Sequence, residues 1–229
     1  MTAHDGRRPA ILAIDTATSR VIIAIGTPDG VAAGLSSWVV GHRHGETLLP
    51  SIERFLGEHN IGRSRLVGIV VGSGPGAFTG LRVGMATAKG MAHGLRIPLV
   101  GVSTAEALMR AVDGHEGRPP VLLLPAGSSD RVMIRPGQAP LLLAGGREPD
   151  LAADELLVAV DLDGRAPADA LARGEQARDS LGQAMLWLGA ARLRAAADGE
   201  LATLVPEYVT LPRGAQPAQG SVEWSRDPR

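Results

Sequence analysis

Residues 72–84 read GSGPGAFTGLRVG and follow directly on the apolar run LVGIVV at 66–71. Three glycines and a proline within residues 72–76 favour backbone angles that most side chains cannot adopt. The stretch therefore predicts a buried strand, a tight turn and then a helix with small residues on its surface. Such a turn lets either a phosphate group or a neighbouring piece of protein approach the backbone closely. The first alternative indicates an enzyme, and the second a protein that works through a partner.

Composition narrows the classes of protein to consider. The chain has 229 residues, 45% of them hydrophobic, which suits one large domain or two small lobes. Its formal net charge of −1 shows no basic excess of the kind that indicates nucleic-acid binding. It contains no cysteine, which excludes disulfides, thiolate metal sites and thiol nucleophiles. No apolar run approaches the roughly 20 residues that span a bilayer, so we expect a cytoplasmic protein without membrane contact.

Turn signals and periodicity divide the first half into strands and helices. Short β-branched runs predict strands at 10–15, 21–25, 31–40, 66–71 and 97–102. Apolar residues at helical spacing predict helices at 46–57 and 79–93. The sequence Ser103-Thr104-Ala105-Glu106 is a capping box, which predicts a third helix ending near residue 112.

The second half repeats this order in shorter form. Strands are predicted at 121–124, 131–135, 141–144 and 157–161, one or two helical turns at 151–155, and a long helix at 177–197. Two copies of a β-β-β-α-β-α order predict an α/β fold of two duplicated lobes, the second one reduced. We assign residues 1–9 to a flexible N-terminus, 10–113 to the first lobe, 114–204 to the second lobe and 205–229 to an extended C-terminal tail.

Three segments together resemble a known family. They are ILAIDTAT at 11–18, His44 with Leu48-Leu49-Pro50 after it, and the glycine-rich stretch 72–84 followed by PLVGVST at 98–104. The chain resembles the TsaB (YeaZ) family over residues 10–110. The resemblance implies the actin/Hsp70/sugar-kinase (ASKHA) fold. It also implies a non-catalytic dimerisation subunit of the bacterial tRNA threonylcarbamoyladenosine (t6A) machinery.

The resemblance also implies a set of partners. The expected partner is the larger paralogue TsaD, which transfers the threonylcarbamoyl group to the adenosine beside the anticodon. A second copy of the chain could replace TsaD when the chain is alone. A TsaE-type ATPase would belong to the larger complex, and tRNA would be reached only indirectly.

The first question is whether the residues at the two predicted hairpins could bind a nucleotide. In this fold ATP is held between two hairpins, one per lobe, each normally with an acidic residue. Asp15 ends the first predicted hairpin strand, and the hydroxyls of Thr16 and Thr18 follow it. The second hairpin reads PAGSS at 125–129, with no carboxylate before Asp130, where the family commonly has Asp-Ala-Arg. We therefore expect Asp15 to brace its own turn, no bound cofactor and no catalytic residue. A self-sufficient ATP-dependent transferase or kinase is the alternative.

The glycine-rich turn and the histidines give weaker signals. The turn lacks the Gly-Lys-Ser/Thr ending of a phosphate-binding loop, which favours a tight strand-to-helix joint. His42 and His44, with Glu46 nearby, could ligate a metal on an extended segment. A His-x-His in a polar loop is more often solvated, so we expect no metal site, and a metallopeptidase is the third alternative.

Small and apolar residues on two helices predict a partner surface. Gly80, Gly84 and Ala88 recur every four residues on the helix 79–93, which allows another helix to approach closely. The resemblance implies that this helix and the helix 46–57 form the subunit interface. The candidate interface residues are Leu48, Leu49, Ile52, Phe55, Gly80, Val83, Gly84, Thr87, Ala88 and Met91. Packing of the glycine face against the chain's own sheet is the alternative.

Overall fold

The fold is taken from a computed structural model, which describes residues 9–39, 44–112, 117–195 and 199–208. Residues 44–46 are described by their backbone alone. Within these ranges the chain forms two mixed sheets joined by helices.

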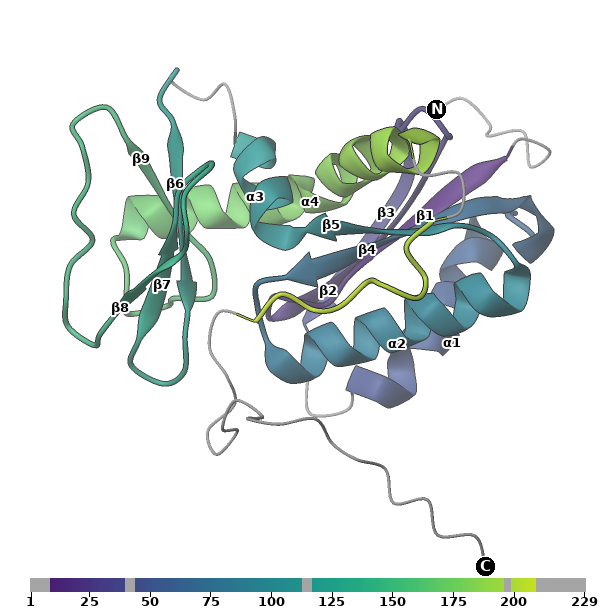
Figure 1. Ribbon diagram of the computed structural model, residues 1–229, viewed down its shortest axis with the longest axis horizontal. Coiled ribbons are helices and arrows are strands. Elements are labelled where there is room, and N and C mark those ends of the chain that lie inside the picture. The colour runs from purple at the N-terminus through teal and green to yellow at the C-terminus, as the bar shows by residue number, and fades with distance from the viewer. Residues whose placement is uncertain (1–8, 40–43, 113–116, 196–198, 209–229) are drawn as a thin grey trace, which may run out of the picture.

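The first sheet has five strands in the order β3-β2-β1-β4-β5 (Figure 1). The strands are β1 (Ala10–Asp15), β2 (Arg20–Gly26), β3 (Ala32–Val39), β4 (Leu66–Gly74) and β5 (Leu99–Ser103). The first three form an antiparallel meander, whereas β1, β4 and β5 run parallel. All six residues of β1 are buried, because helices cover both faces of the sheet.

Two helices cover each face of this sheet. Helices α1 (His44–Glu58) and α2 (Phe78–Leu95) pack on one face. A short 3₁₀ helix, η1 (Arg63–Arg65), precedes β4 and is exposed. Helices α3 (Thr104–Val112) and α4 (Ala168–Ala195) pack on the other face. One half of the predicted capping box is present at the start of α3, since the Glu106 amide donates to Oγ of Ser103 at 3.4 Å. The Glu106 carboxylate instead accepts a hydrogen bond from Arg192 at 2.6 Å.

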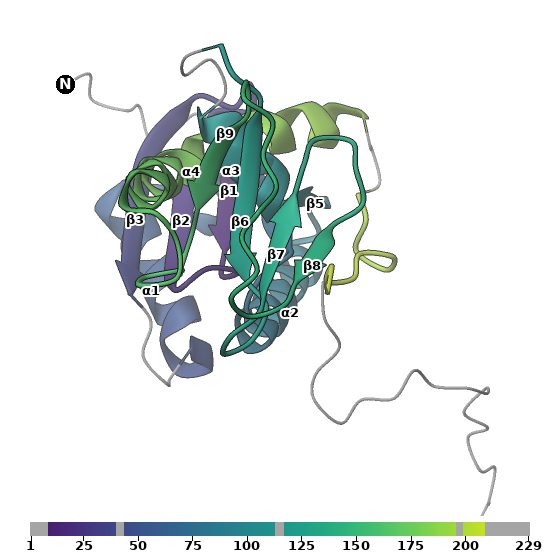
Figure 2. The same ribbon diagram turned by 90° about the vertical axis from the view of Figure 1, so that its left-hand side faces the viewer.

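The second sheet has four strands in the order β8-β7-β6-β9, and Figure 2 shows it nearest the viewer. Its strands are β6 (Pro120–Pro125), β7 (Arg131–Ile134), β8 (Leu141–Leu143) and β9 (Leu156–Ala159). Residues alternate along β6, with Leu122 and Leu124 facing the helices and Val121 and Leu123 facing the other side. The sheet therefore has a core on each face.

Helix α4 connects the two lobes. With 28 residues it is about 42 Å long, and it contacts β9 of the second sheet as well as all five strands of the first. One hydrophobic cluster contains residues of both sheets and of α4, among them Ile11, Val70, Leu122, Val158 and Leu181. The two lobes therefore share a continuous core, and hinge motion between them would have to disturb α4.

Two predictions for the second half are wrong. Residues 151–155 contain no helix, so the second lobe has the order β-β-β-β-α and does not copy the first lobe element for element. The long helix begins at Ala168 and not at residue 177. Its first two turns bury Ala170 and Gly174, which give almost no apolar periodicity.

The segment 199–208, called the C-terminal strap below, returns to the first lobe. The Glu200 amide donates to the Leu99 carbonyl at 2.6 Å, and the Gly101 amide donates to Oε2 of Glu200 at 3.0 Å. The strap thereby covers the free edge of β5. None of the helices in the described ranges has the length and hydropathy that crossing a membrane requires.

Candidate functional site

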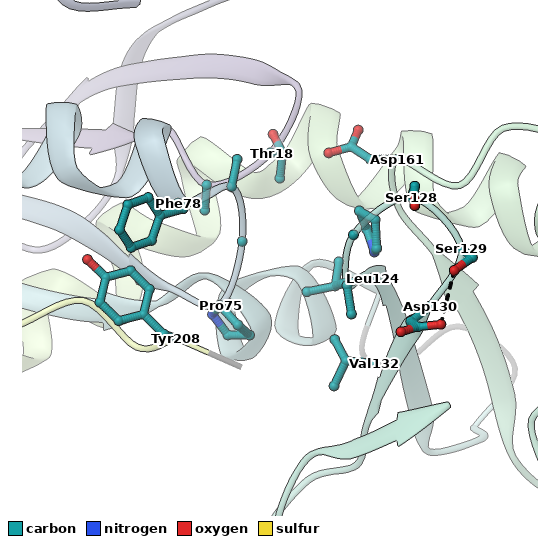
Figure 3. Close-up of a pocket in the computed structure, with 16 residues that line it drawn as sticks. Thr18, Pro75, Phe78, Leu124, Ser128, Ser129, Asp130, Val132, Asp161 and Tyr208 are labelled. Atoms are coloured by element: carbon teal, nitrogen blue, oxygen red, sulfur yellow. Dashed lines mark hydrogen bonds between the residues drawn. The ribbon is translucent and has the colours of Figure 1, made fainter. Parts of the chain in front are cut away.

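A cleft of about 550 Å³ lies between the two lobes (Figure 3). The first lobe contributes Thr18 and the turn before α2, and the second lobe contributes the β6–β7 turn and Asp161. The lining residues are Ala17, Thr18, Pro75, Gly76, Ala77, Phe78, Leu124, Pro125, Ala126, Gly127, Ser128, Ser129, Asp130, Val132, Asp161 and Tyr208.

The glycine-rich stretch packs against the turn between β1 and β2. A Cβ atom on Gly72 would overlap the Asp15 carboxylate, one on Gly76 would overlap the Ala17 carbonyl, and one on Gly80 or Gly84 would overlap Thr16. The Ala77 amide also donates to the Ala17 carbonyl at 2.7 Å. These glycines therefore let β4 and α2 approach the β1–β2 turn, which is the tight strand-to-helix joint that the sequence favours.

Two of the three nucleotide candidates lie outside the cleft. Asp15 is fully buried, and its Oδ2 accepts a 2.6 Å hydrogen bond from Oγ1 of Thr104 while its Oδ1 accepts one of 3.0 Å from the Ala17 amide. Thr16 is also buried, with its hydroxyl donating to the Gly80 carbonyl at 2.8 Å. Neither residue lines the cleft, so in this conformation neither side chain is placed to contact a phosphate there. Thr18 does line it, with its hydroxyl donating to the Arg20 carbonyl at 3.0 Å.

Burial controls the ionisation of Asp15. Loss of solvent raises the pKa of its carboxyl above the ordinary value, hydrogen bonds from Thr104 and Ala17 lower it in part, and the charge of Asp161 raises it. The Asp15 side chain is thus a structural brace for the turn that follows β1, as the sequence analysis predicts.

The second lobe brings to the cleft one acidic group that the sequence analysis did not single out, that of Asp161. Asp161 follows β9 and lines the cleft, and its carboxylate accepts hydrogen bonds from the amide and hydroxyl of Ser19 at 2.7 and 2.5 Å. Arg178 of α4 donates to Asp161 and to the Ser19 hydroxyl. These contacts tie the β1–β2 turn to the second lobe. A carboxylate just after a buried strand was the signal that could have identified Asp161.

Asp130 also lines the cleft on the side of the second lobe, and its contacts there are local. Its Oδ1 accepts hydrogen bonds from the Ser129 hydroxyl at 3.1 Å and from the Gly145 amide at 3.0 Å. Both acidic groups of the cleft thus come from the second lobe, whereas Asp15 of the first lobe is turned inside. Opposed acidic groups, one per lobe, are what metal-assisted phosphoryl transfer in this fold would need, and the described residues do not supply them.

The end of the strap closes one side of the cleft. The Glu207 amide donates to the Ser73 carbonyl at 2.7 Å, and the Ser73 hydroxyl donates to Oε1 of Glu207 at 2.7 Å. The rings of Tyr208 and Phe78 lie 5.0 Å apart. The guanidinium of Arg82 lies 3.8 Å from the centre of the Phe78 ring and donates to the Tyr208 hydroxyl at 3.1 Å.

The predicted partner surface divides into an inner and an outer set. Leu48, Ile52, Phe55, Gly80, Gly84 and Ala88 are buried within this chain. In this conformation they pack inside this chain, so the surface open to a partner comes from the other four candidates. Leu49 is 45% exposed, and Val83, Thr87 and Met91 are half-buried at a spacing of four along α2. These four residues are called the outer helix face below.

The histidine cluster that the sequence offers as an alternative metal site lies outside the described side chains. His42 lies outside the described residues, and the side chains of His44 and Glu46 are likewise outside them. Among the side chains that are described, no group of three or more histidine or acidic residues could hold a metal ion.

The two lobes, their shared helix and the cleft define the ASKHA class of α/β proteins. A profile of the TsaD family, described as tRNA N6-adenosine threonylcarbamoyltransferase, matches residues 33–166, which is more than half of the chain. The chain belongs to this family, and over about half of its length it is similar to TsaB proteins.

Three comparisons illustrate the relationship. TsaB of Escherichia coli is 32% identical over 112 residues, which cover 49% of this chain and 48% of that protein. An uncharacterised protein of Mycobacterium tuberculosis is 41% identical over 99 residues, covering 43% and 47%. The structure of YeaZ from Pseudomonas aeruginosa superposes with a TM-score of 0.63 at 22% identity, covering 88% of this chain and all of that one. The matches span about half, or less, of the length of the curated relatives.

Proposed function

We propose that the chain is a non-catalytic subunit for t6A biosynthesis, pairing with a TsaD-type protein to support threonylcarbamoyl transfer to tRNA. Membership of the TsaD family and the likeness to TsaB support the pathway. The placement of Asp15 supports the non-catalytic role, since the acid at the end of β1 is fully buried and turned away from the cleft. This burial is the observation that carries the proposal.

The outer helix face is the surface that we propose for pairing. Leu49, Val83, Thr87 and Met91 belong to two helices that pack on the same face of the first sheet. Residues four apart on a helix form a ridge that another helix can pack against. A TsaD-type partner would cover this ridge, and a second copy of the chain would cover it when the chain is alone.

The experiment is a reconstitution of t6A formation from purified proteins of the same organism, with and without this chain. Omission should abolish or strongly reduce the yield of modified adenosine. Thr87→Arg places a long charged side chain on the outer helix face and should weaken pairing with TsaD at least tenfold, measured by isothermal titration calorimetry. The matched control is Ala172→Arg on an exposed position of α4, which should leave pairing unchanged.

Two results would contradict the proposal. One is full t6A formation without the chain, which would remove it from the reaction. The other is pairing with TsaD that Thr87→Arg does not weaken, which would place the interface elsewhere. Neither an ATP-dependent kinase nor a metallopeptidase is favoured by an observation on the described residues.

A further inference from the structure

The second lobe carries another hollow, of about 850 Å³, outside the cleft. It lies among the β6–β7 turn and the loops that follow β8 and β9, and it shares Ser129 with the cleft. Its lining residues are Ser129, Arg131, Gly145, Gly146, Glu148, Gly164, Arg165, Ala166 and Pro167. The proposed pairing function does not use any of them.

Arg131 brings a buried positive charge to this hollow. The residue is only 4% exposed. Its guanidinium donates to the Arg165 carbonyl at 2.9 Å and to the Arg147 carbonyl. In the part of the chain that the structure describes, it forms no ion pair with a carboxylate.

Arg165, which is only partly buried, adds a second guanidinium. It donates to the carbonyls of Gly127 and Ser128 at 3.2 and 3.0 Å, and the described residues give it no acidic partner either. Other arginines of this lobe differ: Arg135 pairs with Glu155, Arg173 with Asp169, and Arg178 with both Asp161 and Glu175.

Carbonyl partners satisfy hydrogen bonds without neutralising charge. An arginine side chain stays protonated in proteins, and a charge removed from water is normally balanced by an opposite charge. One carboxylate, that of Glu148, lines the hollow on an exposed residue. The lining itself therefore holds two guanidinium groups and one carboxylate, while the Asp130 carboxylate lies outside the lining on the Ser129 hydroxyl and the Gly145 amide. An anion in the hollow would balance the positive charge of the lining.

The backbone around the hollow suits an anion with several acceptor oxygens. Gly146 and Gly164 have φ angles of 80° and 69°, and their backbone is not shielded by a side chain. Helix α4 begins one residue after Pro167, so the positive end of its dipole lies beside the hollow. Guanidinium groups bind phosphate oxygens through paired N–H donors.

We propose that this hollow binds a phosphate group, with Arg131 and Arg165 as the charged contacts. The phosphate could belong to an RNA backbone or to a small phosphorylated ligand, since the contacts are the same. The RNA source rests on the proposed role in t6A biosynthesis, whereas binding of a small ligand does not.

The first test titrates inorganic pyrophosphate into the ¹⁵N-labelled full chain. Amide shifts should concentrate at Gly145, Gly146 and Gly164, a measurement that needs no variant. Arg165→Gln should weaken pyrophosphate binding at least tenfold. The control Arg194→Gln makes the same change at the other end of α4, about 40 Å away, where Arg194 contacts Pro28 and Asp29. It should bind within twofold of the unchanged protein.

The second test measures binding of labelled unmodified tRNA at several salt concentrations. Weaker binding of both tRNA and pyrophosphate by Arg165→Gln would identify the RNA backbone as the source, with the salt slope reduced by about 0.7–0.9. Weaker binding of pyrophosphate alone would identify a small ligand. Shifts away from the hollow, or unchanged binding of both ligands, would overturn the proposal. Pairing with TsaD should be unaffected by Arg165→Gln, so failure of either proposal is a separate result.

Discussion

Oδ2 of Asp15 accepts a 2.6 Å hydrogen bond from Oγ1 of Thr104, which joins the end of β1 to the start of α3 inside the protein. The other carboxylate oxygen is used by the Ala17 amide at 3.0 Å. An acid at the end of the first strand would serve a nucleotide if it faced the cleft. Here the Asp15 carboxylate connects two elements whose bonded residues lie 89 positions apart in the chain. It is therefore a buried structural contact.

Asp15→Asn should stabilise the protein near neutral pH. Burial raises the pKa of Asp15 in the folded state, so folding favours the protonated form. The stabilisation that this pKa shift of Asp15 contributes is fully present below the pKa of the unfolded chain, about 3.9. It is lost as the pH rises through the higher pKa of Asp15 in the folded protein. Asparagine carries no charge, and its Oδ1 can still accept from the Ala17 amide. Its Nδ2 can donate to Oγ1 of Thr104, which then accepts in place of donating. We expect the free energy of unfolding at pH 7 to rise by about 1 kcal/mol or more.

Urea unfolding at several pH values between 4 and 8 measures this effect. The difference between Asp15→Asn and the unchanged protein should grow with pH over the range in which Asp15 ionises. Asp179→Asn, on an exposed residue of α4, is the control and should not reproduce the gain. A variant less stable than the unchanged protein at pH 7 would show that the ionised carboxylate is itself stabilising.

Two glycines of α2 should respond oppositely to alanine. A Cβ on Gly84 would overlap Oγ1 of Thr16, whereas one on Gly90 would meet nothing within 4 Å. Gly84→Ala should cost about 1–3 kcal/mol of stability through overpacking. Gly90→Ala should add about 0.5–1 kcal/mol, because alanine is the better helix former. Thermal unfolding followed by circular dichroism checks both, and similar effects of the two changes would mean that α2 does not approach Thr16 so closely.

The first lobe could be predicted because its signals are local. Continuous apolar, β-branched runs and apolar helix faces lie within single segments, such as 21–25 and 46–57, and the structure places β2 and α1 there. The start of α4 could not be predicted, since Ala170 and Gly174 are too small to give an apolar period. The first turns of α4 pack closely on β9, where Gly174 lies against the Ala159 carbonyl. This long-range contact gives no local sequence signal.

The candidate site depended more on long-range contacts. The glycine spacing predicted close packing but not its direction, which is toward Thr16 of the same chain. The contact of Asp161 with Ser19 joins residues 142 positions apart, and the pairing of Arg131 with two loop carbonyls is equally invisible in the sequence. Sequence patterns located the residues near the cleft without showing which of them face it.

Removing the negative charge of Asp161 should weaken the connection between the lobes. Asp161 adopts a φ of 57°, which asparagine tolerates, so Asp161→Asn changes the charge and leaves the backbone. Arg178 is 8% exposed and would lose one of its two carboxylate partners. We expect a loss of about 2–4 kcal/mol, because a buried charge then lacks part of its balance.

A double variant separates this effect from general damage. Arg178→Met combined with Asp161→Asn removes the charges of both partners and should be less destabilised than the sum of the two single changes. Denaturant unfolding of all four proteins gives the coupling energy. Strict additivity would show that Arg178 and Asp161 do not stabilise each other.

Truncation of Tyr208 should loosen the C-terminal strap while leaving the core intact. Tyr208 packs on Phe78 and accepts a hydrogen bond from Arg82, and an aromatic pair contributes about 0.5–1.5 kcal/mol beyond its buried area. In Tyr208→Ala, amide exchange at Glu207 should therefore accelerate about threefold to tenfold. Tyr208→Phe keeps the ring and loses only the hydroxyl, so it should accelerate exchange much less. Equal exchange at Glu207 in all three proteins would mean that its hydrogen bonds to Ser73, and not the rings, hold the strap.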